Sequence, residues 1–140
     1  MREILFRGKD EGTKKWVQGY YLKGATRHCI TYSLAYYPRY DVIPETVGQY
    51  TGLTDKNGKK IFEHDILKTC VYDYNWATEE VLTDEHINVV NFVDGCFEVD
   101  ITHSADGYNL LSCLYKEITQ NSEVICNVFD NPELLEGCKE

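Results

Sequence analysis

The chain has 140 residues and a mass of 16.2 kDa, with 43% hydrophobic and 26% charged residues. This size and balance favour one folded domain over residues 1–140 and argue against a disordered chain or two ordinary domains. No apolar run approaches the roughly 20 residues of a membrane helix or the about 7 to 15 of a signal-peptide core. We therefore expect a cytoplasmic protein that does not enter a membrane.

The net charge of −9 is unevenly distributed along the chain. Residues 1–27 contain seven lysines and arginines against three acidic residues, a net charge of +4, which leaves −13 for the remainder. Between Thr69 and Tyr115 there is no lysine or arginine, whereas nine carboxylates fall in this stretch. Such a block repels the phosphates of nucleic acids and attracts basic surfaces.

The first part of the chain is predicted to form a β-hairpin. Apolar and aromatic residues at 4–7 and 15–23 flank the polar segment Lys9-Asp10-Glu11-Gly12-Thr13, which is typical of a turn between two strands. The second strand is covered on both faces or bends at Gly19. Residues 24–44 are rich in tyrosine and contain two prolines, which predicts a loop with one short extended piece.

A second hairpin is predicted in the middle of the sequence. Its strands, at 47–53 and 59–62, flank the turn Asp55-Lys56-Asn57-Gly58, and Glu63-His64-Asp65 then forms a corner into a strand that continues to Tyr74. Residues 75–85 are acidic and unpatterned. We expect them to form a surface excursion with room for a helical turn at 78–82.

The last third of the chain contains the clearest turn. Asp94-Gly95 suits a type I′ turn between strands at 87–93 and 96–102. Leucines and an isoleucine at helical spacing predict a short amphipathic helix over 110–118. A final strand is predicted over 123–129, followed by a helix that begins at Asn131-Pro132-Glu133 and ends at Gly137.

Patterns that carry common chemistry are missing from the sequence. The four histidines form no pair at i, i+2 or i, i+4, and there is no phosphate loop, dinucleotide fingerprint or nucleophile elbow. His28 and Cys29 are neighbours, so on a strand they point to opposite faces. The six cysteines form no C-x-x-C pair and are expected to be free thiols. We expect no catalytic residue, cofactor or metal.

Two surface segments are candidates for binding. The first is acidic and consists of Glu79, Glu80, Asp84 and Glu85. It is a candidate for binding a protein partner that has a basic surface. The second, a nucleic-acid surface that we favour less, consists of Lys14, Lys15, Trp16, Tyr20 and Lys23. The acidic residues can also serve solubility alone. Clustering of the lysines beside the two rings on one exposed face would favour nucleic-acid binding.

Three stretches of sequence point to a known family. They are REILFRGK with KKWVQGYY, then PETVGQYTGLTDKNGKKIFEHDILK from Pro44, and finally EVICNVFDNPELLEG. In these stretches the chain resembles the YopX family of small proteins encoded by bacteriophages and prophages. His64 and Cys126 stand where that family usually has glycine. Histidine tolerates left-handed φ better than most residues, so we expect the corner at His64 to persist with some strain.

The residues alone predict a β-rich α+β fold, and the resemblance implies a mainly β fold whose core is a small SH3-like barrel, with the N-terminal hairpin and a short C-terminal helix added. It also implies a phage accessory protein of unassigned activity whose relatives self-associate. We therefore expect a non-enzymatic homo-oligomer that acts through protein contacts in the bacterial host cytoplasm. The alternative is a nucleic-acid-binding SH3-like module that uses the basic N-terminal hairpin.

Overall fold

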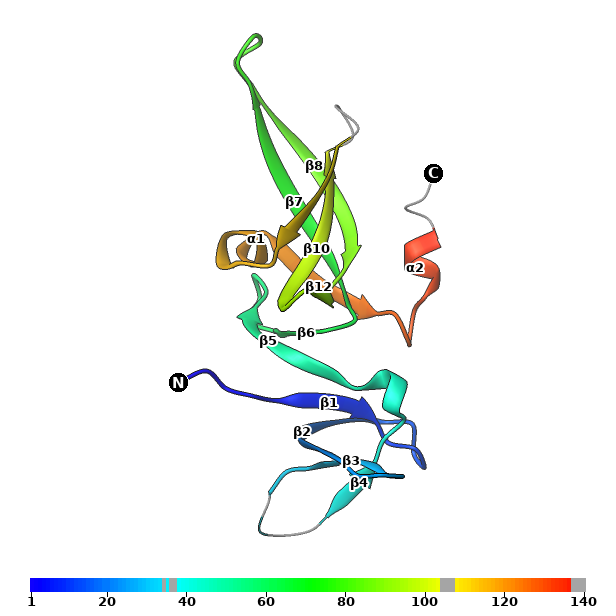
Figure 1. Cartoon of the computed structure of the whole chain (residues 1–140). Helices are drawn as coiled ribbons and strands as arrows, with labels where there is room; N and C mark the ends of the chain where they lie inside the picture. The colour runs from blue at the N-terminus through cyan, green and yellow to red at the C-terminus, as the bar shows by residue number, and fades with distance from the viewer. Residues whose placement is uncertain (34, 36–37, 104–107, 137–140) are drawn as a thin grey trace. The chain divides into compact units, whose positions relative to one another are not determined.

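The described residues of the computed structural model, 1–33, 35, 38–103 and 108–136, are mainly β (Figure 1). The contacts within the chain divide it into two compact units, Met1–Gly52 (unit 1) and Leu53–Glu140 (unit 2). The mainly β class is confirmed, and so are the N-terminal hairpin and the short C-terminal helix. The single domain over residues 1–140 stays a prediction.

Unit 1 is an antiparallel sheet in the order β4-β3-β2-β1-β5. Its elements are β1 (Phe6–Lys9), β2 (Trp16–Lys23), β3 (His28–Thr31), β4 (Arg39–Asp41), the 3-10 helix η1 (Pro44–Thr46) and the first part of β5 (Gly48–Thr54). The loop predicted over 24–44 is wrong in part. Pairing of β3 with β2 and of β4 with β3 makes extended structure there, which the local composition did not indicate.

One face of the unit 1 sheet covers a small apolar core. Its members are Val17, Ile30 and Val42, with the partly buried Phe6, Tyr21, Tyr40 and Val47 packed against them. At Gly19 the backbones of β2 and β3 approach closely, and a Cβ atom there would lie 2.2 Å from the carbonyl oxygen of Thr31. The core face of β2 therefore has no room for a side chain at this position.

Unit 2 contains two three-stranded antiparallel sheets, in the orders β12-β7-β8 and β11-β10-β9, and β5 ends in this unit by pairing with β6. Its elements are β6 (Lys60–Phe62), β7 (Asp65–Asn75), β8 (Glu80–Val89), β9 (Asn91–Val93), β10 (Cys96–His103), β11 (Tyr108–Cys113), α1 (Lys116–Gln120), β12 (Ser122–Asn127) and α2 (Glu133–Glu136). The core is formed by Ile61, Leu67, Val90, Val99, Leu114, Ile118 and Val124.

Two predicted elements of unit 2 are wrong. The excursion over 75–85 is mostly strand, because β8 pairs with β7 from Ile66↔Val89 to Asn75↔Glu80 and leaves only 76–79 for the turn. The helix over 110–118 is also wrong, since β11 occupies its first part and α1 begins at Lys116. Pairing with β10 overrides the local periodicity, which does not separate a short buried helix from a strand.

The remaining predictions for unit 2 agree with the structure at the level of element type. The hairpin around Asp94-Gly95 joins β9 to β10, the final strand is β12, and α2 follows Pro132. Gly137, the predicted end of that helix, lies outside the described residues. Within the described part of the chain, no helix is long and apolar enough to cross a membrane.

The described sheets are open. β8 and β12 are the edges of one unit 2 sheet, and β9 and β11 are the edges of the other. Closure into a barrel requires the edge strands to pair with each other. The described residues thus contain no closed barrel, and the SH3-like barrel that the resemblance implies is not confirmed.

A buried carboxylate fixes the turn at 55–58. The side chain of Asp55 is 5% exposed, and its Oδ1 accepts the backbone N–H groups of Asn57 at 2.8 Å and Lys59 at 2.9 Å. Its Oδ2 accepts the N–H of Val124 on β12 at 3.0 Å. Burial, the largest influence, raises the pKa of Asp55, but the three N–H donors together outweigh it and the net pKa is lowered.

The corner before β7 is held by backbone hydrogen bonds. His64 has a positive φ of 72°, as expected for a residue in a position that favours glycine. Its N–H donates to the carbonyl of Val90 at 2.8 Å, and its carbonyl accepts the N–H of Val128 at 3.1 Å. Asp65 is 1% exposed, and its Oδ2 accepts the N–H of Phe62 at 2.8 Å. These bonds offset the strain at His64.

Replacement of Gly19 by alanine is expected to destabilise unit 1 by about 1 to 3 kcal/mol or more, because the new methyl group meets the backbone of β3. Gly12→Ala is the matched control, since the nearest atom to its Cβ is the side-chain Oδ1 of Asp10 at 3.4 Å. Urea unfolding followed by circular dichroism measures both variants. Equal stability of the two would contradict the close approach of β2 and β3.

Asp55→Asn is expected to lower the free energy of unfolding by about 2 to 3 kcal/mol at pH 7, because an amide N–H₂ must face a backbone N–H donor in a buried site. The folded-state pKa of Asp55 lies below its unfolded value of about 3.9. The contribution of the Asp55 carboxylate to the free energy of unfolding is therefore complete above the unfolded-state pKa. It is lost as the pH falls through the folded-state pKa.

The measurement is urea unfolding of both proteins at pH 7 and at about pH 3. The difference between wild type and Asp55→Asn should shrink at the lower pH. Asp94→Asn, in an exposed turn, controls for loss of a carboxylate and should have little effect at either pH. A difference that is the same at both pH values would mean that the charge of Asp55 does not act as described.

Candidate interaction surface

The outer part of the β7–β8 hairpin forms a two-stranded arm (Figure 1). β12 pairs with β7 only over Asp65 to Thr69, whereas β8 accompanies β7 as far as Asn75. Beyond Thr69, β8 is the only strand of the described residues that pairs with β7. We call residues 70–85 the hairpin arm. Its base is held in the core of unit 2, and its outer part is open to solvent.

Aromatic side chains line one face of the hairpin arm. Tyr72 and Tyr74 lie two residues apart on β7 and therefore point to the same face, where Val81 is the cross-strand partner of Tyr74. Tyr72 is 61% exposed, Tyr74 41% and Trp76 86%. The rings of Tyr74 and Trp76 meet edge to face with their centroids 4.6 Å apart. Grouped exposed aromatic side chains are typical of surfaces that bind another protein.

The structure brings the four predicted acidic residues into the hairpin arm but divides them between its faces. Glu79 lies in the turn, with a φ of 57°. Glu80 and Asp84 alternate with Glu85 along β8, so only Glu85 shares the aromatic face. Glu85 Oε2 lies 3.1 Å from Lys68 Nζ at the base of the arm. The arm thus combines apolar rings with carboxylates and contains no lysine or arginine.

The structure does not gather the predicted nucleic-acid surface on one face. Trp16 and Tyr20 share a face of β2, whereas Lys23 has the opposite orientation at the far end of the strand. The cations over the Trp16 ring are those of Arg7, 4.8 Å from the ring centroid, and Lys9, 5.5 Å away. The other two predicted lysines, Lys14 and Lys15, are exposed in the turn before Trp16.

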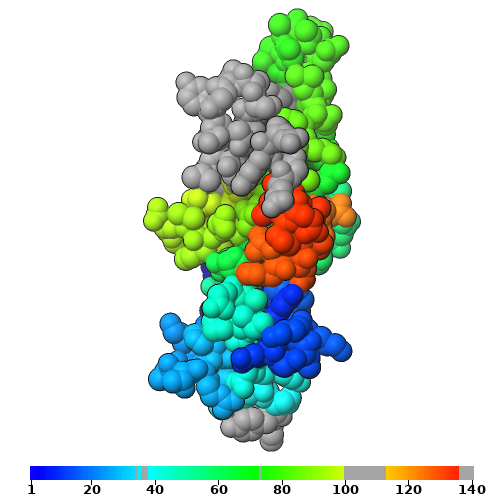
Figure 2. Space-filling view, turned by 90° about the vertical axis from the view of Figure 1, so that its right-hand side faces the viewer, coloured from blue at the N-terminus to red at the C-terminus, as the bar shows by residue number. Residues whose placement is uncertain are grey.

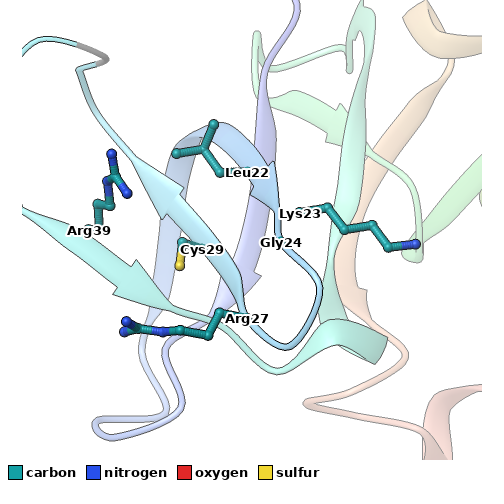
Figure 3. A pocket seen from close by; sticks show the side chains of 6 residues that line it. All are labelled: Leu22, Lys23, Gly24, Arg27, Cys29 and Arg39. Carbon is teal, nitrogen blue, oxygen red and sulfur yellow. The ribbon is translucent and has the colours of Figure 1, made fainter.

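Lys23 instead lines a pocket of unit 1 with a volume of about 440 Å³ (Figure 3). The pocket is lined by Leu22, Lys23, Gly24, Arg27, Cys29 and Arg39. Figure 3 shows the side chain of Lys23 pointing away from those of Arg27 and Arg39. The guanidinium group of Arg27 is held by Asp41, with Nη2 2.6 Å from Oδ2 and 2.9 Å from Oδ1. The three cations of this pocket therefore do not converge on one point.

The thiol in this pocket has a raised pKa. Cys29 Sγ donates to Asp41 Oδ1 at 3.2 Å. Burial, followed by the hydrogen bond and the charge of Asp41, raises the pKa of Cys29. Asp41 in turn has a lowered pKa, chiefly because of its hydrogen bond from Arg27. His28 points to the other face of β3, where Nδ1 hydrogen-bonds the hydroxyl of Tyr21, so it does not act as a base for Cys29.

Reasoning from the sequence missed the aromatic residues of the hairpin arm. The signal was the alternation of Tyr72 and Tyr74 in the strand that was predicted to continue to Tyr74, because residues two apart on a strand share a face. Because residues 75–85 were expected to be an irregular excursion, Trp76 was not recognised as a ring that packs against Tyr74 from the turn after β7. Figure 2 shows the tip of the arm, in green, as a projection of side chains.

The geometry defines a class: an antiparallel β protein with two compact units, one of which carries a projecting hairpin with aromatic and acidic residues. The model of the YopX protein family matches residues 5–136 of the chain. Because this match covers most of the sequence, the chain belongs to the YopX family.

Two known proteins are similar to this chain. The SPbeta prophage-derived uncharacterized protein YopX of Bacillus subtilis (strain 168) is 33% identical over 82 residues, which is 59% of this chain and 54% of that protein. The chain thus aligns with about half the length of this relative. The crystal structure of protein EF1440 from Enterococcus faecalis matches with a TM-score of 0.55 and 23% identity, over 96% of this chain and 99% of that one. This second likeness concerns the fold alone.

Removal of the Asp41 carboxylate is expected to make Cys29 more reactive. Asp41→Asn removes the charge that raises the pKa of Cys29 and replaces the carboxylate acceptor of its hydrogen bond by a weaker, neutral amide oxygen, while Arg27 and Arg39 continue to lower this pKa. The thiolate fraction at pH 8, and with it the rate of alkylation by iodoacetamide, should therefore increase. The rate at Cys29 is measured by mass spectrometry of peptides, with Cys70 as the internal control. An unchanged ratio of the two rates would contradict the role of Asp41.

Proposed function

We propose that the protein is a non-enzymatic phage or prophage accessory protein that acts through protein–protein contacts in the bacterial host cytoplasm. Its hairpin arm binds a host protein with a basic surface, and the chain works as a homo-oligomer. The observation that carries this proposal is the exposure of Tyr72, Tyr74 and Trp76 at the end of an arm that contains carboxylates and no lysine or arginine. Membership in the YopX family, with a prophage-derived relative, supports the phage origin.

The aromatic face provides the affinity in this proposal. Tyrosine and tryptophan are enriched among the residues that contribute most to protein–protein binding, since they bury a large area with few rotatable bonds. Trp76 and Tyr74 already contact each other, so part of their freedom is lost before a partner arrives. A partner that covers these rings replaces solvent on the apolar face of the arm.

The charge of the arm selects the partner. Carboxylates beside an apolar patch favour lysine and arginine on the opposite surface, speed the encounter and repel nucleic acid. Lys68, at the base of the arm, offsets part of this charge through its contact with Glu85. The segment 1–27 of a second copy, with its net charge of +4, also has the required sign, and this supports self-association.

The second candidate function is nucleic-acid binding by the basic N-terminal hairpin, in the manner of an SH3-like module. The observation that favours it is the pair of cations, Arg7 and Lys9, over the Trp16 ring, with Lys14 and Lys15 in the adjoining turn. Stacking platforms for single strands combine rings and cations in this way. The separation of Lys23 from these residues weakens this candidate.

The test is affinity capture with the tagged full chain from host lysate, at low and high salt and with and without nuclease. Three variants are compared: Tyr72→Ser with Trp76→Ser, a charge variant with Glu79→Gln, Glu80→Gln, Asp84→Asn and Glu85→Gln, and the matched control Lys14→Gln with Lys15→Gln. All these side chains are exposed, so each variant should keep its fold, as circular dichroism verifies.

We expect one protein to be captured in stoichiometric amount, to survive nuclease and to be lost at high salt, where the Debye length falls to about 3 Å at 1 M. Its yield should fall at least about tenfold in both arm variants and remain unchanged in the lysine control. Capture that does not depend on the arm would overturn the proposal. Recovery of nucleic acid alone, lost in the lysine variant, would establish the second candidate instead. Analytical ultracentrifugation tests whether the chain forms a homo-oligomer. A sedimentation profile of a monomer at all protein concentrations would contradict this part of the proposal.

A further inference from the structure

The sheet β11-β10-β9 brings two thiols and a carboxylate together. Cys96 and Glu98 are two residues apart on β10 and therefore share a face of the sheet. Cys113, at the end of β11, is the cross-strand partner of Glu98. One ligand atom from each of the three side chains lies within 4.8 Å of the other two. The residues are separated by up to 17 positions in sequence, so only the register of the sheet assembles them.

One polar atom of this cluster, the carboxylate oxygen Oε2 of Glu98, is buried without a hydrogen bond among the described residues. The hydrogen bond between the Cys96 and Cys113 thiols is the first cause that raises the pKa of Cys96, to about 11, and burial is the second. No lysine or arginine occurs between Thr69 and Tyr115, the stretch that contains all three residues. A buried carboxylate oxygen beside two thiols fits a bound cation.

We propose that Cys96, Glu98 and Cys113 bind one zinc ion through two sulfur atoms and a carboxylate oxygen. Zinc bonds of about 2.3 Å to sulfur and about 2.0 to 2.2 Å to oxygen place neighbouring tetrahedral ligand atoms roughly 3.5 to 3.8 Å apart. The present separations need only a small contraction to reach this geometry. Both thiols lose their protons to solvent as the Zn–S bonds form, and the fourth position is left for water.

The donor set selects the type of metal. Two thiolates favour a soft or borderline ion such as Zn²⁺, whereas Mg²⁺ and Ca²⁺ prefer sites built from oxygen ligands. The ion joins β10 to the end of β11, directly before Leu114, a member of the unit 2 core. Binding to the folded state alone therefore stabilises unit 2.

The experiment uses the reduced, metal-free full chain. Co²⁺ is added first, because thiolate ligands give near-ultraviolet charge-transfer bands and tetrahedral geometry gives intense visible bands, and Zn²⁺ is then used to displace it. The variants are Cys113→Ser, at an exposed position, and Glu98→Gln, which keeps the side-chain shape. Cys70→Ser is the matched control, since Cys70 is a free thiol of unit 2 outside the cluster.

We expect one Co²⁺ per chain with thiolate bands, displacement by Zn²⁺, and a rise of the thermal midpoint with Zn²⁺. Each cluster variant should lower the affinity for Zn²⁺ by at least about tenfold, whereas Cys70→Ser should leave it unchanged. Absence of thiolate bands, or equal loss of binding in the Cys70 control, would overturn the proposal. Formation of a Cys96–Cys113 disulfide under mild oxidation, without metal binding by the reduced chain, would also overturn it and assign the pair to redox chemistry.

Discussion

The carboxylate of Asp55 is the interaction on which the arrangement of unit 2 depends. It accepts three backbone N–H groups, two within its own turn and one from Val124 on β12, and it does so in a buried site. Lys56 N–H also donates to the carbonyl of Ser122, so the whole turn is docked on β12. Once β12 is fixed, Val124 completes the core that contains Ile61. A single side chain thus couples the shape of a turn to the position of a strand far along the chain.

The first residues of β7 connect the core of unit 2 to the hairpin arm, which we propose as the binding surface. Thr69 and Ser122 share a buried hydrogen bond of 2.8 Å between their hydroxyl groups, and the Ser122 hydroxyl also lies 2.7 Å from the carbonyl of Ile118 at α1. After Thr69, β7 no longer pairs with β12 and enters the hairpin arm, where Val71 still packs against the core. The buried residues of β7, which stabilise the fold, and its exposed residues, which we propose bind a partner, therefore lie in successive parts of the same strand. If the arm acts as proposed, substitutions at its exposed outer positions alter partner binding without loss of the core.

Local chemistry explains which parts of the fold were predictable from sequence. Asp94-Gly95 and the turn at 55–58 were recognised because their residue types favour specific backbone angles, and His64 adopts the positive φ expected from its place in a family motif. Long-range pairing decided the rest. Residues 110–113 match a helical pattern but form a strand because β10 lies beside them, and Cys113 meets Glu98 only through that register. The spacing of Glu98 and Cys113 in the sequence does not predict this contact.

The long sequence separations in unit 2 also set the order in which the chain can acquire structure during synthesis. Asp55 is 69 residues from Val124, and Thr69 is 53 residues from Ser122, whereas the hairpin of β1 and β2 closes over a few residues. On a ribosome, unit 1 can therefore form its local pairings while unit 2 still lacks β12. Until that strand emerges, the inner edge of β7 is unpaired, and the nascent chain exposes an apolar strand edge. During this stage of synthesis, a chaperone or a second nascent copy can bind the unpaired edge of β7.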